Sequence, residues 1–343
     1  MIERHRIAVN RSCGGVFVYY KEEAVFEQYS LEVLDTYKGR GAVFAVTDKG
    51  KVYLKEYAGS AAKADFLAEI LDAVNEKGLR TERVVSTKEG EHLSHDLDGY
   101  AYLMRYWCEG KECSTGSWDE IQKGVKTLAS LHNVLNETTE EMPEVLKSGE
   151  EKLLETYEKH TRELRTIKNY VKSRKSKSEF EKEFLELYPR LEEQAQEILD
   201  GLRNQQGQRQ GFGVCHGDFN QHNIVFCENE PAIISFDSIC YDVQVSDLAR
   251  FMRKILEKNN WNMGLGMEMI RSYEESRKMS EYETEQLYLR LAYPEKFWKI
   301  ANHYYNANKA WGFGRYLEKL EKMKSEEENR AQFLAFMKHF AYS

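Results

Sequence analysis

The stretch from residue 213 to residue 247 constrains the fold of this chain more than any other part. It contains three short apolar runs, rich in β-branched residues and bounded by polar residues, glycine or proline, at 213–215, 224–226 and 232–234. Runs of this kind are typical of β-strands. A polar loop, 216–223, separates the first two runs. A loop held between two strands can fix its side chains against one ligand.

This loop contains an aspartate and an asparagine five residues apart, Asp218 and Asn223, and begins with His216 and Gly217. Phosphoryl transfer needs a base near the attacking hydroxyl and hard oxygen ligands for magnesium. The catalytic loop of kinases has the same spacing, with the aspartate as base and the asparagine on the metal. Chance would give His-Gly-Asp with this asparagine in well under roughly 1% of chains of this length. The loop therefore predicts a phosphotransferase site, and a polar hairpin loop is the alternative.

The same stretch resembles the aminoglycoside phosphotransferase and choline kinase superfamily, whose signature is HGDxxxxN, an IDF strand and a later DLA. All three places are present, at 216–218 with Asn223, at 234–236 and at 247–249. The resemblance implies that Asp218 and His216 are catalytic, that Asn223 binds a metal, and that ATP and Mg²⁺ are the cofactors. It also implies that Asp247 braces the catalytic loop.

The chain departs from this signature at Ser235, which stands where the family has a metal-binding aspartate. In an extended strand, residues i and i+2 share a face about 6–7 Å apart, so Asp237 could replace the missing ligand if the strand end bends toward the site. The Ser235 hydroxyl could also bind the metal, but without charge. Losing a carboxylate beside a dication costs on the order of a few kcal/mol of metal affinity, which would slow transfer about a hundredfold or more.

The N-terminal third predicts a small sheet that carries the remaining nucleotide contacts. Two apolar runs, 43–46 and 52–55, flank a hairpin turn signal, and a further strand is expected at 31–34. In the turn before them, Gly39 and Gly41 could let backbone N–H groups approach phosphate, or form an ordinary turn.

Lys55 ends a strand and matches the kinase lysine that pairs with the α- and β-phosphates. A solvated lysine at the end of a strand is the alternative. The next segment, 61–77, has helical spacing and carries Glu69 as the candidate partner of Lys55, with Glu76 as its rival. The buried strand expected at 99–107 would lead into an adenine-contacting hinge that begins near Met104.

The rest of the chain predicts a larger helical region. Helices are expected at 118–135 and 247–260, long charged helices at 136–203, and an all-helical aromatic segment at 262–343. Asp247 is expected to cap its helix, and His132 to be a packed structural histidine. We therefore predict an α+β, bilobal protein kinase-like fold with a β-rich N-lobe at 1–105 and a helical C-lobe at 106–343.

Composition limits the classes of partner. The net charge of −8 argues against nucleic acid, and no apolar run is long enough to span a membrane. The N-terminus lacks the apolar segment of a secretory signal, so synthesis in the cytoplasm is expected. The six cysteines form no CxxC pair, which favours reduced thiols.

Three further blocks are similar to the CotS-type spore coat proteins of endospore-forming Firmicutes, at 38–57, 242–261 and 292–311. This resemblance implies a kinase-like fold located in the spore coat, with other coat proteins as partners.

Three functions remain open. Ser235 favours a pseudokinase or a very weak phosphotransferase. The complete HGDxxxxN favours an active ATP-dependent enzyme for a small-molecule acceptor, similar to aminoglycoside, choline or homoserine kinases, with Asp218 as base and Asp237 on magnesium. The third is a scaffold that binds no nucleotide.

Overall fold

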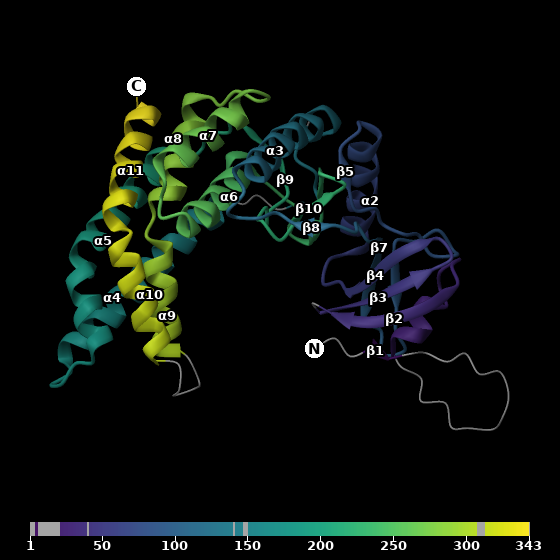
Figure 1. Cartoon of the computed structure of the whole chain (residues 1–343), viewed down its shortest axis with the longest axis horizontal. Helices are drawn as coiled ribbons and strands as arrows, with labels where there is room; N and C mark the ends of the chain where they lie inside the picture. The colour runs from purple at the N-terminus through teal and green to yellow at the C-terminus, as the bar shows by residue number, and fades with distance from the viewer. Residues whose placement is uncertain are drawn as a thin grey trace. The chain divides into compact units, whose positions relative to one another are not determined.

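The computed structural model describes residues 4–5, 21–39, 41–139, 141–146, 150–306 and 313–342 (Figure 1). The chain is α+β, as predicted, and forms two compact units that interleave along the sequence. Unit 1 comprises 1–113, 133–146 and 222–239, and unit 2 comprises 114–132, 147–221 and 240–343. The boundary at 105/106 stays a prediction.

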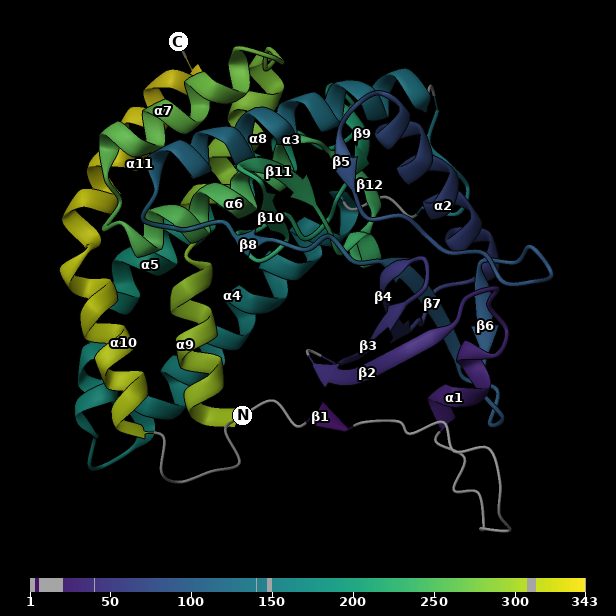
Figure 2. The same ribbon diagram turned by 45° about the vertical axis from the view of Figure 1, so that its right-hand side comes forward.

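The main sheet of unit 1 has six strands in the order β1-β2-β3-β4-β7-β6, and every neighbouring pair is antiparallel (Figure 2). The strands are β1 (Arg4–His5), β2 (Val33–Gly39), β3 (Ala42–Thr47), β4 (Gly50–Glu56), β6 (Leu93–His95) and β7 (Ala101–Tyr106). The predicted hairpin is confirmed, since Thr47 pairs with Gly50, whose φ of 113° few other residues adopt. The strand expected at 31–34 instead begins at Val33 and runs to Gly39.

Alternation along β4 decides which side chains reach the site. Val52 and Leu54 pack into an apolar cluster with Met104 of β7 and Tyr29, which follows α1 (Lys21–Phe26). Successive side chains of a strand point to opposite faces, so Tyr53 and Lys55 lie on the other face of the sheet.

Unit 1 is completed by α2 (Ala61–Glu76) and a smaller sheet. Ser60 caps α2 by accepting a hydrogen bond from the N–H of Lys63, and Gly78 follows the helix end with a φ of 88°. The smaller sheet has the order β5-β11-β10-β8. Its strands are β5 (Arg80–Thr81), β8 (Lys111–Glu112), β10 (Ile224–Cys227) and β11 (Glu230–Ile233).

Unit 2 is mainly helical, and its two strands β9 (Phe212–Cys215) and β12 (Cys240–Val243) pair with each other. Its helices are α4 (Glu150–Ser173), α5 (Glu179–Asn204), α6 (Val245–Lys258), α7 (Met263–Glu274), α8 (Glu281–Ala292), α9 (Glu295–Asn306), α10 (Phe313–Ser325) and α11 (Glu327–Tyr342). The helix α3 (Trp118–Thr138) crosses the division between the units.

The charged segment forms the helix pair α4 and α5, against which α9 and α10 pack (Figure 2). A capping box between Ser178 and Glu181 begins α5, and the apolar stripe of this helix is buried. Several of the C-terminal aromatic residues pack on this core: Trp298, Tyr304, Tyr305 and Tyr316. Trp311 lies outside the described residues. No helix in the described part of the chain is long and apolar enough to cross a membrane.

One helix begins earlier than predicted. The helix expected from Asp247 starts at Val245, and its N-cap is Gln244, which makes no side-chain capping bond. Asp247 is therefore inside the first turn, and its carboxylate is left for other partners.

Candidate functional site

Unit 1 contains a cleft of about 390 Å³ above the face of the sheet that carries Lys55. This volume is within the range of small-molecule pockets, roughly 300–1,000 Å³. Strands β3 and β4 form one wall, and the segment 222–235 forms another, with these lining residues: Ala42, Phe44, Tyr53, Lys55, Trp107, His222, Asn223, Ile234 and Ser235. The cleft thus brings together three residues that the sequence placed in the site: Lys55, Asn223 and Ser235.

Aromatic rings form one part of this cleft. The ring of Trp107 meets Phe44 and Tyr53 edge-on, with centroids 5.0 and 5.7 Å apart. Edge-to-face rings at this separation pack favourably. The cleft therefore has an aromatic side as well as a charged one.

The charged side is an ion-pair network around Asp237. One carboxylate oxygen accepts a hydrogen bond from Lys55 Nζ at 2.7 Å, and the other accepts one from an Arg105 guanidinium nitrogen at 2.5 Å. Arg105 also lies 3.6 Å from Glu82, and both of these side chains are fully buried. Burial opposes ionisation of Asp237, but the charges of Arg105 and Lys55 outweigh it and lower the pKa of the carboxyl.

Glu82 joins this network to the Ser235 turn. Its carboxylate accepts hydrogen bonds from the backbone N–H groups of Ser235 at 2.9 Å and Phe236 at 3.0 Å, and from the Tyr53 hydroxyl at 2.5 Å. A buried carboxylate with this many donors is well compensated. Glu82 therefore fixes the turn to the sheet.

The chain around Ser235 is not an extended strand, as the i, i+2 argument assumed. Strand β11 ends at Ile233, Ser235 is left-handed with φ 68° and ψ 52°, and Phe236–Ser238 form a 3₁₀ turn. A left-handed backbone is costly for residues with a Cβ and persists where surrounding contacts hold it. This turn carries Asp237 to Lys55 and Arg105.

Sequence reasoning missed Arg105, Glu82 and Tyr53. The available signal was the arginine within the apolar strand Ala101–Tyr106. A fully buried arginine requires a carboxylate partner, and that requirement pointed to an unrecognised acidic residue.

Other expected site residues lie elsewhere. Glu69 is exposed on α2, and no hydrogen bond or ion pair joins it to Lys55 in the part of the chain that the structure describes. Met104 is fully buried in the apolar cluster, so Trp107 is the residue of the expected hinge that reaches the cleft. Gly39 pairs with Ala42 across a tight turn in which Gly41 has a φ of 71°.

The loop that carries Asp218 is anchored within unit 2 by Asp247. The Asp247 carboxylate accepts hydrogen bonds from the backbone N–H of His216 at 2.7 Å and of Gly217 at 2.9 Å. Burial lowers the pKa of the His132 imidazole, and the neighbouring Asp247 raises it. Burial has the larger effect, so the pKa of His132 is lowered. This arrangement is what a bracing role for Asp247 requires.

The ring of His216 is buried, and its Nδ1 accepts a hydrogen bond from the N–H of Asp218 at 3.1 Å. This contact holds the loop rather than a substrate. The side chain of Asp218 is about half exposed, and its carboxylate lies 4.0 Å from the guanidinium of Arg250.

The residues of the cleft do not fit a magnesium ion well. Mg²⁺ prefers octahedral oxygen ligands that include one or two carboxylates. Both oxygens of Asp237 are bonded to side-chain cations, and Asn223 and Ser235 offer only uncharged oxygens. Across the described ranges, no group of three or more His, Cys, Asp or Glu residues is placed to hold a metal.

Comparison with protein families gives one match over almost the whole chain. The family described as "Spore coat putative kinase YutH" matches residues 22–337. The chain belongs to this family. The predicted resemblance to spore coat proteins of a kinase-like superfamily is confirmed.

A curated relative and two solved structures are also similar to this chain. The chain is 24% identical to spore coat protein S of Bacillus subtilis (strain 168) over 298 residues, 84% of each protein. It is similar to an aminoglycoside phosphotransferase from Alicyclobacillus acidocaldarius, with a TM-score of 0.80, 19% identity, and coverage of 97% of this chain and 99% of that one. For spectinomycin phosphotransferase APH(9)-Ia, solved with ADP and spectinomycin, the TM-score is 0.58 at 13% identity, with 92% and 97% covered. The fold is thus the aminoglycoside phosphotransferase-like one.

Proposed function

We propose that this chain is a spore coat-associated pseudokinase, which transfers phosphoryl groups very weakly or not at all. The observation that carries the proposal is the state of Asp237, whose two oxygens are bonded to Lys55 and Arg105. The lysine that should bind phosphate and the carboxylate that should replace the missing metal ligand thus neutralise each other. Other coat proteins are its expected partners, as the family implies.

The aromatic side of the cleft supports the same conclusion. In the kinase sequence V-A-I-K, a small alanine lies two residues before the lysine and on the same face of the strand. Here Tyr53 stands two residues before Lys55, and its buried ring lines the cleft with Phe44 and Trp107. We expect these rings to narrow the space for a nucleotide base, so that ATP binds weakly.

The test is isothermal titration of ATP with and without Mg²⁺, on the wild type and on Ser235→Asp. We expect the wild type to bind with a Kd of about 1 mM or weaker and without dependence on Mg²⁺. A new carboxylate at 235 is expected to introduce Mg²⁺-dependent binding that is about tenfold tighter or more. The matched control is Ser238→Asp, at an exposed position of the same turn, which should leave binding unchanged.

A direct assay of transfer decides between the pseudokinase and the active enzyme. Asp218 is half exposed, so a base could still act there. Transfer of ³²P from ATP to a hydroxyl compound by the wild type, with loss of that transfer in Asp218→Ala, would refute the pseudokinase. Tight Mg²⁺-dependent ATP binding by the wild type would refute the account of Asp237.

A further inference from the structure

Unit 2 contains a second, partly open cavity of about 280 Å³, lined by residues of α4, β12, α6, α8 and α9. Its wall is strongly basic although the chain as a whole has a net charge of −8. Three carboxylates and six cations line it, and the cations are Arg250, Arg253, Lys254, Arg290, Lys296 and Lys299. We call this space the basic cavity.

The carboxylates of the basic cavity are already engaged or shared. Asp242 accepts hydrogen bonds from Arg290 at 3.1 and 3.4 Å. Glu295 serves two cations, Arg253 and, at 2.5 Å, Lys299. Lys296 pairs at 3.2 Å with Glu326, which does not line the cavity. Of the lining residues, Glu257 is the remaining carboxylate, and Arg250 and Lys254 are the remaining cations.

Two cations of the cavity wall lack a close carboxylate. The exposed side chain of Lys254 makes no ion pair or hydrogen bond in the described part of the chain, and Arg250 forms an ion pair with Asp218 at 4.0 Å. Burial lowers the pKa of Lys299, and the charges of Arg253 and Arg250 lower it further, although Glu257 opposes them.

Buried nitrogens on the same wall also lack partners. Among the described residues, no hydrogen bond reaches Arg253 Nε, Arg290 Nε or His160 Nδ1. The side chains of Arg290 and His160 belong to residues that are only 6% and 8% exposed. Buried polar atoms without a partner are rare because each costs about 1–3 kcal/mol. These nitrogens are closed off from solvent, so a ligand in the cavity would contact the neighbouring cations instead.

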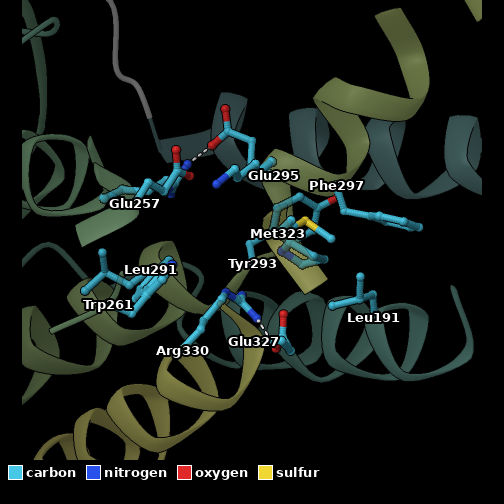
Figure 3. A pocket seen from close by; sticks show the side chains of 13 residues that line it. Leu191, Glu257, Trp261, Leu291, Tyr293, Glu295, Phe297, Met323, Glu327 and Arg330 are labelled. Carbon is cyan, nitrogen blue, oxygen red and sulfur yellow. Dashed lines mark hydrogen bonds and ion pairs between the residues drawn. The ribbon is translucent and has the colours of Figure 1, made fainter. Parts of the chain in front are cut away.

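The neighbouring void is too small to be the binding site. It shares Arg253, Glu257, Glu295 and Lys296 with the basic cavity, and Figure 3 shows it with Glu257 and Glu295 on one side and Arg330 paired with Glu327 on the other. Its volume of about 20 Å³ holds roughly one water molecule. The basic cavity has about nine times the roughly 30 Å³ that one water occupies in the liquid.

The basic cavity is adjacent to the Asp218 loop. Arg250 lines the cavity and lies 4.0 Å from Asp218. The same helix, α6, holds that loop through Asp247. A ligand whose anionic group contacts Arg250 would therefore have its other groups within reach of the Asp218 carboxylate.

We propose that the basic cavity binds a small anionic hydroxyl compound, a phosphate ester or carboxylate of monosaccharide size, beside Asp218. Cationic amines such as aminoglycosides are disfavoured by like charge. The binding does not require ATP, magnesium or phosphoryl transfer, so it goes beyond the pseudokinase proposal and holds with or without it. The cavity is too small for a folded partner.

The experiment is isothermal titration of the full chain, without ATP or Mg²⁺, with glucose 6-phosphate, 3-phosphoglycerate, glucose and kanamycin. We expect at least one of the two anions to bind at least tenfold more tightly than glucose and kanamycin, and its binding to weaken as salt rises. The double variant Lys254→Gln/Lys299→Gln should weaken anion binding about tenfold or more. The matched control is Lys258→Gln, an exposed lysine of α6 that does not line the cavity.

Three results would overturn the proposal: no binding of either anion up to about 10 mM, equal binding by the wild type and the double variant, or tighter binding of kanamycin. Circular dichroism of both variants checks that each is folded. Because nucleotide is absent, a negative result here leaves the pseudokinase proposal intact. Phosphoryl transfer by the wild type would refute that proposal without affecting anion binding.

Discussion

The cleft of unit 1 and the basic cavity of unit 2 differ in the balance between cationic and anionic side chains. In the cleft, Lys55 and Arg105 meet Asp237 and Glu82, so two cations face two carboxylates. Six cations and three carboxylates line the basic cavity, and Glu326, which does not line it, pairs with Lys296. A network that neutralises itself stabilises the fold and has little left to offer a charged ligand. A surplus of cations is stabilised by an anion from outside.

The largest effect on this comparison is expected from Arg105→Met. Removing the buried guanidinium leaves Glu82 and Asp237 without their shared cation, so we expect the free energy of unfolding to fall by about 3–5 kcal/mol. Urea denaturation followed by circular dichroism measures it. Arg83→Met is the control, because Arg83 is about half exposed and 4.0 Å from Asp72, and should change stability by less than about 0.5 kcal/mol. A loss below about 1 kcal/mol in Arg105→Met would show that the network is not a structural unit.

A smaller effect is expected from Tyr53→Phe. This change removes the hydroxyl that donates to Glu82 and accepts from Arg105 at 3.2 Å, while it keeps the ring. Hydrogen bonds to charged groups contribute about 1.5–3 kcal/mol, and we expect a loss of that size in urea denaturation. Tyr170→Phe, at a half-exposed position, should differ from the wild type by less than about 0.5 kcal/mol. If the two variants were equally stable, Tyr53 would only fill space.

The smallest effect is a pH dependence that arises on the wall of the basic cavity. Burial lowers the pKa of His160 from its ordinary value near 6.5 to about 4. Between about pH 6.5 and pH 4, His160 is therefore protonated in the unfolded chain but largely neutral in the folded state. Because the unfolded chain binds more protons, the contribution of His160 to stability falls as the pH drops through this range. Between pH 7 and pH 5, the free energy of unfolding should therefore fall more in the wild type than in His160→Phe, by on the order of 1 kcal/mol.

Urea denaturation at both pH values measures this difference. A residual slope is expected in the variant, because burial also lowers the pKa of His132. Parallel pH profiles for the wild type and His160→Phe would contradict the prediction.

Much of the fold could be predicted from local sequence patterns. The hairpin around Asp48, the helix α2 and the capping box of α5 follow from turn chemistry, helical spacing and capping residues, all of which act within a few positions. The helix start at Val245 was missed because a plausible capping residue, Asp247, makes its hydrogen bonds with a distant loop instead.

The candidate site could be predicted only in part from the sequence. Lys55, Asn223 and Ser235 were placed together by the order of their motifs, and the structure puts them on one cleft. The strand assumed at Ser235 was wrong because Glu82, which is 153 residues away in the chain, holds the turn there. No local pattern around Ser235 encodes that contact.

The sequence by itself determined the superfamily, the α+β architecture and the replacement of an aspartate by Ser235. These depend on spacing and on residue identity, which are properties of neighbours in the chain. Only the tertiary structure decided that Asp237 pairs with Lys55 and Arg105, and that cations from α6, α8 and α9 share one cavity. Electrostatic compensation depends on distances of a few ångströms between residues that are far apart in the chain, and those distances exist only after folding.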